Sequence, residues 1–544
     1  MSKWPVLVVL AAAQFLMVLD QAVMNVAISQ LVEDFATTVT TIQIVIALYA
    51  LVMAGLMLTG GKIGDLIGRR RAFTIGLCIY GAGSALTAVS WSVPVLTLGW
   101  SVLEGIGAAL VMPAMIALVA GNFRDQERAL AYGVLGGVAG AGIAVGPILG
   151  GWATTELSWR VVFAGEVLVA IGILLGTRWL EEPKRSGSAQ GLDWVGAVLS
   201  ALGLGTLVFG VIQASNWGWL EPRDSPLEPF GFSLTPFVIA AGGLILTAFS
   251  AWERHREASG LAPLVHLRLL KVPMLRSGTA MLLAQNLILM GIFFTVPLYL
   301  QISQGLDALE TGVRMLPASA GLFLSAIAGS SLAKRFPARL LVRVGLAIVL
   351  LATLLLLDTV EPELDNASFL IAMGVLGVGM GLIVSQLGNV VQSAVGDDDR
   401  SEAGGLQFTA QQLGSSLGTA LLGAIVITGL IAAFSANVAK NPAIPADVQG
   451  KVQVQLAAGA SFVPASQVES AARAQGVDPE TTATLVSDYE DAQIAALKIA
   501  FLCAVFLVLA SFLATRRLPT QLFDQLQQGD RAPPIPEPNL SQTI

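Results

Sequence analysis

Charged residues, cysteine and histidine are all scarce in this chain of 544 residues. Only 12% of the residues are charged, which is about half the share usual in soluble domains. The two cysteines, Cys78 and Cys503, fall within apolar runs, so the sequence predicts neither a disulfide framework nor a cysteine-based metal site. The two histidines, His255 and His266, flank one loop, and a buried proton relay would therefore have to use carboxylates.

Two kinds of catalytic motif are also missing. The sequence has no glycine-rich nucleotide-binding loop, which argues against ATP as a source of energy. No nucleophile–base pair and no set of metal ligands can be assembled from its apolar segments, which argues against an enzyme.

Apolar residues make up 55% of the chain and are gathered in long runs. A helix needs about 20 apolar residues to cross a hydrocarbon layer of about 30 Å, and a span must be helical because the bilayer offers its backbone no water. We therefore predict an all-α, polytopic membrane protein with fourteen transmembrane helices. They are expected at 5–30, 42–61, 72–91, 94–120, 130–153, 161–180, 193–214, 234–253, 277–301, 311–333, 338–358, 367–394, 404–434 and 491–515.

Lysine and arginine collect in alternate loops, which is the pattern of loops on the cytoplasmic side. The loop after the second span has Lys62 and three arginines, and Arg516 and Arg517 follow the last span. The short loop "DTVEPELDNAS" has no base. The distribution predicts a multi-pass protein of the plasma (inner) membrane with both termini in the cytoplasm.

Two weak sequence echoes divide the chain into halves. "GGKIGDLIGRRR" after span 2 has a degenerate counterpart, "AGSSLAKRFPARLL", after span 10, and the glycine-rich run of span 5 has one in span 13. Such repeats are frequent in membrane transport proteins. We expect a six-helix half at 1–185, two inserted helices at 186–260, five helices of the second half at 261–434, an extracytoplasmic segment of short amphipathic helices at 435–490, the last span at 491–518 and a disordered cytoplasmic tail at 519–544.

One carboxylate, that of Asp20, lies deep inside the first span, in the string "FLMVLDQAVMNVAI". An ionisable group at this depth costs about 3 kcal/mol or more unless it faces a cavity or a partner. Asp20 is therefore the first candidate for a functional residue.

The loop after span 2 reads "GKIGDLIGRRR". Its glycines permit a tight turn between helices, and one acid among several bases can form ion pairs and contacts to helix ends. A basic loop of this kind can also do no more than fix the topology. The string resembles the G-x-L-A-D-x-x-G-[RK]-[RK] loop of the major facilitator superfamily, which locks the cytoplasmic side against the neighbouring helix; Leu66 stands where a base is common.

This resemblance implies that the loop controls the conformational change. Asp65 is then expected to pair with Arg69, or with Arg124 or Arg128 near the inner end of span 4. The residues implied in gating are Gly61, Asp65, Gly68, Arg69, Arg70 and Arg71.

The resemblance extends over nearly the whole chain. "LDQAVMNVA" at 19–27 is similar to the first-span signature L-D-x-T-x-x-N-V-A of the fourteen-span drug:proton antiporter family, with Ala22 in place of its Thr. "GIAVGPILGG" at 142–151 is similar to the family's span 5 motif, in which Gly146 and Pro147 are implied to bend the helix at the central cavity. The family implies a major facilitator fold with two six-helix halves plus two inserted helices. It also implies transport by alternating access, driven by a proton gradient and without a cofactor.

Span 4 departs from the family pattern R-x-x-Q-G-x-G-A-A, because this chain has "SVLEGIGAA" at 101–109. Ser101 replaces the Arg usually tied to proton transfer, and Glu104 adds a second intramembrane acid. Glu104 and Asp20 are predicted at similar depths, so we expect them to face one cavity. Burial and a neighbouring acid both favour the neutral form of a carboxyl group, so the two are expected to share a proton. In the alternative, Glu104 is a hydrogen-bonded packing residue.

Several further residues are candidates for contact with a substrate, and each has a structural alternative. Glu166 in span 6 replaces an Asn common in the family, but its place near the outer rim leaves a structural role equally open. Gln411 either lines the cavity or bonds a neighbouring helix, and the aromatic candidates either touch substrate or pack. The substrate set is Ser101, Glu104, Glu166, Phe293, Tyr299 and Gln411.

Taken together, the residues and the resemblance predict a secondary active transporter that exports lipophilic, cationic small molecules in exchange for protons. Export of lipids or of a dedicated metabolite is the first alternative, and a non-transporting membrane scaffold is the second. The expected partners are a small-molecule substrate, protons and the lipid bilayer, without nucleic acid. We expect a monomer, and a periplasmic adaptor is left open.

Overall fold

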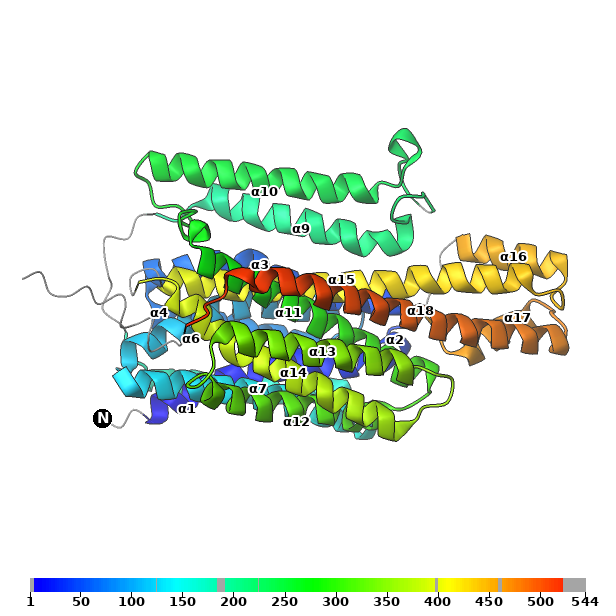
Figure 1. Cartoon of the computed structure of the whole chain (residues 1–544), viewed down its shortest axis with the longest axis horizontal. Coiled ribbons are helices and arrows are strands. Elements are labelled where there is room, and N and C mark those ends of the chain that lie inside the picture. The colour runs from blue at the N-terminus through cyan, green and yellow to red at the C-terminus, as the bar shows by residue number, and fades with distance from the viewer. Residues whose placement is uncertain are drawn as a thin grey trace, which may run out of the picture.

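The computed structural model of the protein describes residues 4–123, 125–182, 191–223, 225–396, 400–457 and 462–521. Within these ranges every regular element is a helix, and most helices run along one common axis (Figure 1). The all-α prediction is confirmed. The predicted tail 519–544 lies outside the described residues from position 522 onward.

The first part of the chain forms a bundle in which the helix of span 4 is continuous but irregular. The short helix α5 passes through a π-helical stretch, η1, into α6, which contains Pro113. The elements are α1 (Trp4–Val26), α2 (Ile28–Asp34), α3 (Val39–Ile67), α4 (Arg69–Ala88), α5 (Val93–Leu96), η1 (Thr97–Glu104), α6 (Gly105–Asn122), α7 (Asp125–Glu156) and α8 (Trp159–Gly176).

The second part repeats this arrangement after two additional helices. The additional helices are α9 (Trp194–Trp217) and α10 (Thr235–Ala258). They are followed by α11 (Pro273–Pro297), its π-helical end η5 (Leu298–Ser303), α12 (Ala308–Leu332), α13 (Ala338–Thr359), α14 (Asn366–Ser393), α15 (Arg400–Lys440), α16 (Ala446–Ala457), α17 (Ala465–Ala474) and α18 (Pro479–Ala514).

Thirteen helical stretches among the described residues are long and apolar enough to cross a membrane. They coincide with all the predicted spans except 72–91. That segment is α4, a helix of 20 residues that packs one face against α6 and α8 and exposes the other. Three arginines begin α4, and glycine, serine and threonine recur along it, which lowers its mean hydropathy.

The two parts are joined mainly toward the end of the bundle where α2 lies. Gln301 accepts from the backbone N–H of Ser29 at 3.2 Å and donates to the carbonyl of Val26 at 2.8 Å. Gln43 of α3 donates to the carbonyls of Thr419 and Ala420 at 3.0 Å each. Among the described residues, all hydrogen bonds between 1–185 and 261–518 lie from the middle of the bundle toward α2. This end of the interface is closed.

The inserted helices α9 and α10 form a separate pair along one side of the bundle (Figure 1). Only α9 packs extensively on the bundle, where it contacts α3 and α15, while α10 packs mainly on α9. At one end, Asp193 caps α9 by accepting from Gly196 N–H at 2.9 Å, and it also pairs with Arg256 of α10 at 3.3 Å. This buried contact ties the start of α9 to the end of α10.

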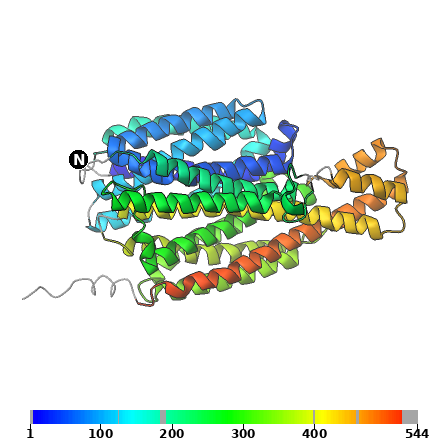
Figure 2. The same ribbon diagram turned by 90° about the horizontal axis from the view of Figure 1, so that it is seen from above.

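Helices α15 and α18 extend far beyond the rest of the bundle and carry α16 and α17 at their tips (Figure 2). The 41 residues of α15 correspond to a length of about 60 Å. The hydroxyl of Tyr489 on α18 donates to the Val463 carbonyl at 3.1 Å, and Asn441 donates to the carboxylate of Asp488 at 2.9 Å. Both helices therefore continue into the polar region that we predicted to lie between them as a separate segment.

At the α2 end, Asp34 links three parts of the first half. Arg160 donates to the Asp34 carboxylate at 2.7 Å and to the carbonyl of Ser90 at 3.0 Å, and the Trp159 indole N–H donates to the same carboxylate at 2.9 Å. Partial burial raises the pKa of this carboxyl group, but its hydrogen bonds and the charge of Arg160 outweigh burial and bring the pKa below its usual 3.8.

We expect Asp34→Asn to lower the thermal midpoint of the purified protein at pH 7 by about 2 °C. A lowered pKa means that Asp34 stabilises the fold above its unfolded value of 3.8 and loses this effect as the pH falls through the folded value. The difference between variant and wild type should therefore shrink below pH 3.8, as followed by tryptophan fluorescence. A difference that does not change with pH would contradict the ion pair.

Candidate functional site: a buried cluster of carboxyl groups

Three intramembrane acids from three different helices meet inside the first half. Asp20 of α1 and Glu104 at the end of η1 are completely buried, and Glu166 of α8 is 2% exposed. One carboxyl oxygen from each lies within 4.8 Å of the other two. The predicted proximity of Asp20 and Glu104 is therefore present in the structure. Glu166, which we placed near the rim, lies in the same cluster.

The irregular helix of span 4 brings Glu104 to this place. The π-helical stretch Thr97–Glu104 ends at the acid itself, and such widened turns often occur at functional sites. Opposite it, α4 approaches closely at Gly83, where a Cβ atom would lie 2.7 Å from Cγ of Glu104. A glycine is needed there because any larger residue would push Glu104 out of the cluster.

Each acid accepts a hydrogen bond through one of its two oxygens. The Trp100 indole N–H donates to Asp20 Oδ1 at 2.7 Å, and the Thr87 hydroxyl donates to Glu104 Oε1 at 3.2 Å. The other three oxygens, Asp20 Oδ2, Glu104 Oε2 and Glu166 Oε1, are buried without a hydrogen-bond partner among the described residues.

Hydroxyl groups from α3 and α4 complete the surroundings of the cluster. Tyr80 and Ser84 of α4 each donate to Glu166 Oε2 at 3.3 Å. Tyr49 of α3 stacks on Trp100 with the ring centroids 4.5 Å apart and the planes at 8°. Its hydroxyl faces the same carboxyl groups and has no hydrogen-bond partner among the described residues.

No lysine or arginine balances these acids in the part of the chain that the structure describes. Two carboxylates 4.8 Å apart repel each other by about 3–4 kcal/mol even at an effective dielectric constant of about 20. The three groups cannot all be ionised together without a counter-charge. Oxygen atoms in this arrangement can bind protons, and they are also of the type that hard cations prefer.

The sequence as a whole identifies the family. Residues 10–419 match the Major Facilitator Superfamily. The chain belongs to this superfamily. Membership makes the protein a multi-pass membrane transporter of small molecules and not an enzyme.

Several proteins of the superfamily are similar over most of the chain. The puromycin resistance protein pur8 of Streptomyces alboniger is 33% identical, with 82% of this chain and 86% of that protein covered. The tetracenomycin C resistance and export protein of Streptomyces glaucescens is 30% identical over 78% of this chain and 76% of its own. The multidrug efflux pump LfrA of Mycolicibacterium smegmatis is 29% identical over 78% of this chain and 80% of its own.

The fold is also that of a solved superfamily structure. A bacterial homologue of the human lysosomal transporter Spinster, in an inward-facing and unoccupied conformation, aligns with a TM-score of 0.59 and 16% identity. The alignment covers 98% of this chain and all of that one. The predicted major facilitator fold is confirmed.

The other predicted substrate residues make their hydrogen bonds and ring contacts outside the carboxyl cluster. The Ser101 hydroxyl donates to the Val45 carbonyl at 2.8 Å, and the Tyr299 hydroxyl donates to the Glu361 carbonyl at 2.9 Å. Phe293 is buried in the apolar core around α11, and Gln411 of α15 is half-buried. No hydrogen bond or ring contact joins any of these four to the cluster within the described ranges.

The superfamily loop after α3 contains the ion pair expected for Asp65 and a further contact, by Glu182, that sequence reasoning missed. Asp65 pairs with Arg69 one helical turn away, and Arg69 also donates to the carbonyl of Gly61 at 2.9 Å. Glu182, more than a hundred residues later, accepts from the backbone N–H groups of Arg69 at 2.6 Å and Arg70 at 3.0 Å. It thereby caps the start of α4. Arg71 is exposed, and Arg124 and the side chain of Arg128 lie outside the described residues.

Two glycines govern the backbone at these gating positions. Gly68, between α3 and α4, has φ +106°, a conformation that L side chains rarely adopt. Gly146 lies where α7 meets α1, and a Cβ atom there would be 2.3 Å from Cβ of Ala22. The next residue, Pro147, stands inside α7 and brings its carbonyl against Gly312 of α12. The predicted bend motif therefore lies between α1 and α12.

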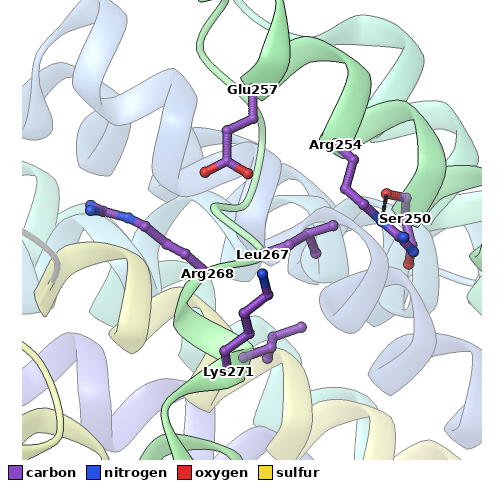
Figure 3. A pocket seen from close by; sticks show the side chains of 7 residues that line it. Ser250, Arg254, Glu257, Leu267, Arg268 and Lys271 are labelled. Atoms are coloured by element: carbon purple, nitrogen blue, oxygen red, sulfur yellow. Dashed lines mark hydrogen bonds between the residues drawn. The ribbon is translucent and has the colours of Figure 1, made fainter.

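A pocket of about 560 Å³ lies elsewhere, beside the end of α10 (Figure 3). Arg254, Arg268 and Lys271 line it together with the acid Glu257. In Figure 3 the Lys271 ammonium group points into the pocket, whereas the Arg268 guanidinium group points away from it. The pocket and the carboxyl cluster share no residue, and these bases do not neutralise the three acids.

Proposed function

We propose that this protein is a proton-coupled exporter of lipophilic, cationic small molecules. The observation that carries the proposal is the cluster of Asp20, Glu104 and Glu166, which is buried at membrane depth with no lysine or arginine beside it among the described residues. Removing such acids from water is costly, and a proton or a cationic substrate is the charge that can offset this cost. The names of the relatives, which include antibiotic resistance and multidrug efflux proteins, support the same reading.

In the mechanism that we propose, protons and a cationic substrate compete for the same negative charge. Asp20 and Glu104 form the proton-coupling pair. A proton that enters from outside neutralises the pair and weakens the hold on a cation, and loss of that proton to the inside restores the charge. The substrate would bind between the halves, where Phe293 and Gln411 are the proposed contacts, because α11 packs against α1 and α15 packs against α3 of the other half.

Alternating access would come from rocking of the halves 1–185 and 261–518. We propose that the protein lies in the plasma membrane as a monomer with both termini in the cytoplasm, as the distribution of lysine and arginine favours. The end of the bundle near α2 then faces outside. The hydrogen bonds between the halves lie from the middle of the bundle toward that end, so the outer end of the interface is closed.

The test is a substrate-induced pH change in proteoliposomes with purified protein. An ethidium gradient should drive proton movement in the opposite direction, and an outward-directed proton gradient, with an acidic vesicle lumen, should drive ethidium accumulation. Blocking of this exchange only by acyl-chain compounds would favour a lipid exporter. The absence of any coupled proton movement across cationic, neutral and acyl compounds would rule out the proposal.

We further propose that Asp65 stabilises the state in which the cytoplasmic side is closed. Asp65→Asn removes the ion pair with Arg69 and should shift the population toward the inward-open state by about 1–3 kcal/mol, a typical conformational coupling energy. Distances between spin labels on the inner ends of the two halves would measure the shift. The exposed acid Glu490 on α18 provides a control as Glu490→Gln, and equal distance distributions in all three proteins would refute the role.

A further inference from the structure

Glu166 occupies a position that the proposed pair of Asp20 and Glu104 does not explain. Family resemblance places an Asn at this point of the helix, and an amide would satisfy the Tyr80 and Ser84 hydroxyls that donate to Glu166. Instead the chain has an acid that is 2% exposed, with its Oε1 atom unpartnered among the described residues. Since an unpaired buried charge is strongly destabilising, the acid requires a ligand of its own.

The spacing of the three acids limits how many of them can be charged. With one oxygen of each within 4.8 Å of the others, a second ionised group adds about 3–4 kcal/mol of repulsion at an effective dielectric constant of about 20. A third ionised group adds this repulsion twice. At most one carboxylate is therefore ionised in the closed cluster, and at least two protons are bound.

The groups around the cluster suit protons better than a resident metal ion. The polar groups that face it are Tyr49 from α3, Tyr80, Ser84 and Thr87 from α4, and Trp100 from η1. A hydroxyl can donate to a carboxylate and accept from a carboxylic acid, so the same neighbours serve both protonation states. The unpartnered Tyr49 hydroxyl, 1% exposed, is a further acceptor for a carboxyl proton.

We propose that Glu166 is the third proton-binding group of the transporter and that the cluster exchanges two protons for each substrate molecule. This inference rests on the proposed proton-coupled export. Each proton that moves down its gradient contributes about 1.4 kcal/mol of free energy to transport per pH unit. Two protons would sustain about a hundredfold substrate gradient per pH unit for a neutral substrate, and exchange with a doubly charged cation would move no net charge. The cluster therefore suits cations with one or two charges.

The stoichiometry can be measured in proteoliposomes with the membrane potential clamped at zero by potassium and valinomycin. The ethidium gradient at which net flux stops is determined at several pH differences. We expect it to change about a hundredfold per pH unit in the wild type and about tenfold in Glu166→Gln, with transport retained. Glu490→Gln, at an exposed position on α18, should behave like the wild type, and Glu166→Asp should restore the hundredfold dependence.

Three results would overturn the inference. A tenfold dependence in the wild type would rule out two protons, and a hundredfold dependence in Glu166→Gln would show that Glu166 only packs. Competition of Mn²⁺ or Na⁺ with the coupling protons would assign the cluster to a metal cation. The same measurement separates this inference from the proposed function. If only the two-proton stoichiometry is wrong, proton-coupled export will still appear as a tenfold dependence. If Glu166→Gln does not fold, Glu166→Asn, which introduces the residue common in the family at this point, takes its place and should show the tenfold dependence.

Discussion

The Asp20→Asn variant should fold and reach the membrane but lose all accumulation of substrate against a gradient. Asp20 is fully buried, and its Oδ1 atom accepts from the Trp100 indole at 2.7 Å, a bond that the amide oxygen of Asn can keep. What the variant loses is a group that can exchange a proton. Flux of ethidium down its own gradient should continue. Accumulation of ethidium against its gradient, to which each coupled proton contributes a factor of about ten per pH unit, should disappear.

The matched control for this variant is Asp358→Asn, because Asp358 is exposed at the end of α13. It should export like the wild type. Measurements of ethidium accumulation and of substrate-induced proton release in the same vesicles separate loss of coupling from loss of protein. Normal proton release from Asp20→Asn would show that another group carries the coupling proton.

Replacing Glu104 should distinguish charged from neutral substrates. Glu104→Gln keeps the shape of the side chain and an acceptor for Thr87, which donates to Oε1 at 3.2 Å in the wild type, but it removes one of the groups that can carry the negative charge of the cluster. A charge at this distance is worth about 3–4 kcal/mol at an effective dielectric constant of about 20. Export of monovalent cations should therefore fall by at least about tenfold, while export of neutral compounds should change much less.

Because Glu104 is completely buried behind α4 and α6, we expect it to act on the substrate through charge and not through contact. Initial rates for a cationic and a neutral dye of similar size, measured in one preparation, test this. Equal losses for both dyes would mean that Glu104 is a packing residue, which was the alternative left open by the sequence. Glu490→Gln again serves as the control for removing an acid elsewhere.

The sequence was sufficient for the fold because its strongest signals are local. Runs of apolar residues locate the spans, and the strings around Asp20, Asp65 and Gly146 are enough to indicate the family. The proximity of Asp20 and Glu104 followed from similar depths in neighbouring helices. These inferences need only the position of a residue along its own helix.

Contacts set by packing between distant segments could not be predicted in this way. Glu166 was placed near the rim by counting from the start of its helix, but Gly83 and the π-helical stretch 97–104 draw α4 and span 4 together around it. The cap that Glu182 provides for α4 joins residues more than a hundred positions apart. Helices α15 and α18 run past the predicted spans 404–434 and 491–515, because a helix that leaves the bilayer can stay helical with a polar sequence.

The position of the inserted helices makes the two seams between the halves unequal. One seam, between α3 and α15, is covered by α9, whose Val208 and Ile212 pack with Ala47 and Ala420. The opposite seam, between α7 and α12, presents Trp152, Leu324 and other apolar side chains outward. The flank of α7 and α12 therefore contacts lipid directly, so the lipid composition there should influence how readily the two halves move against each other.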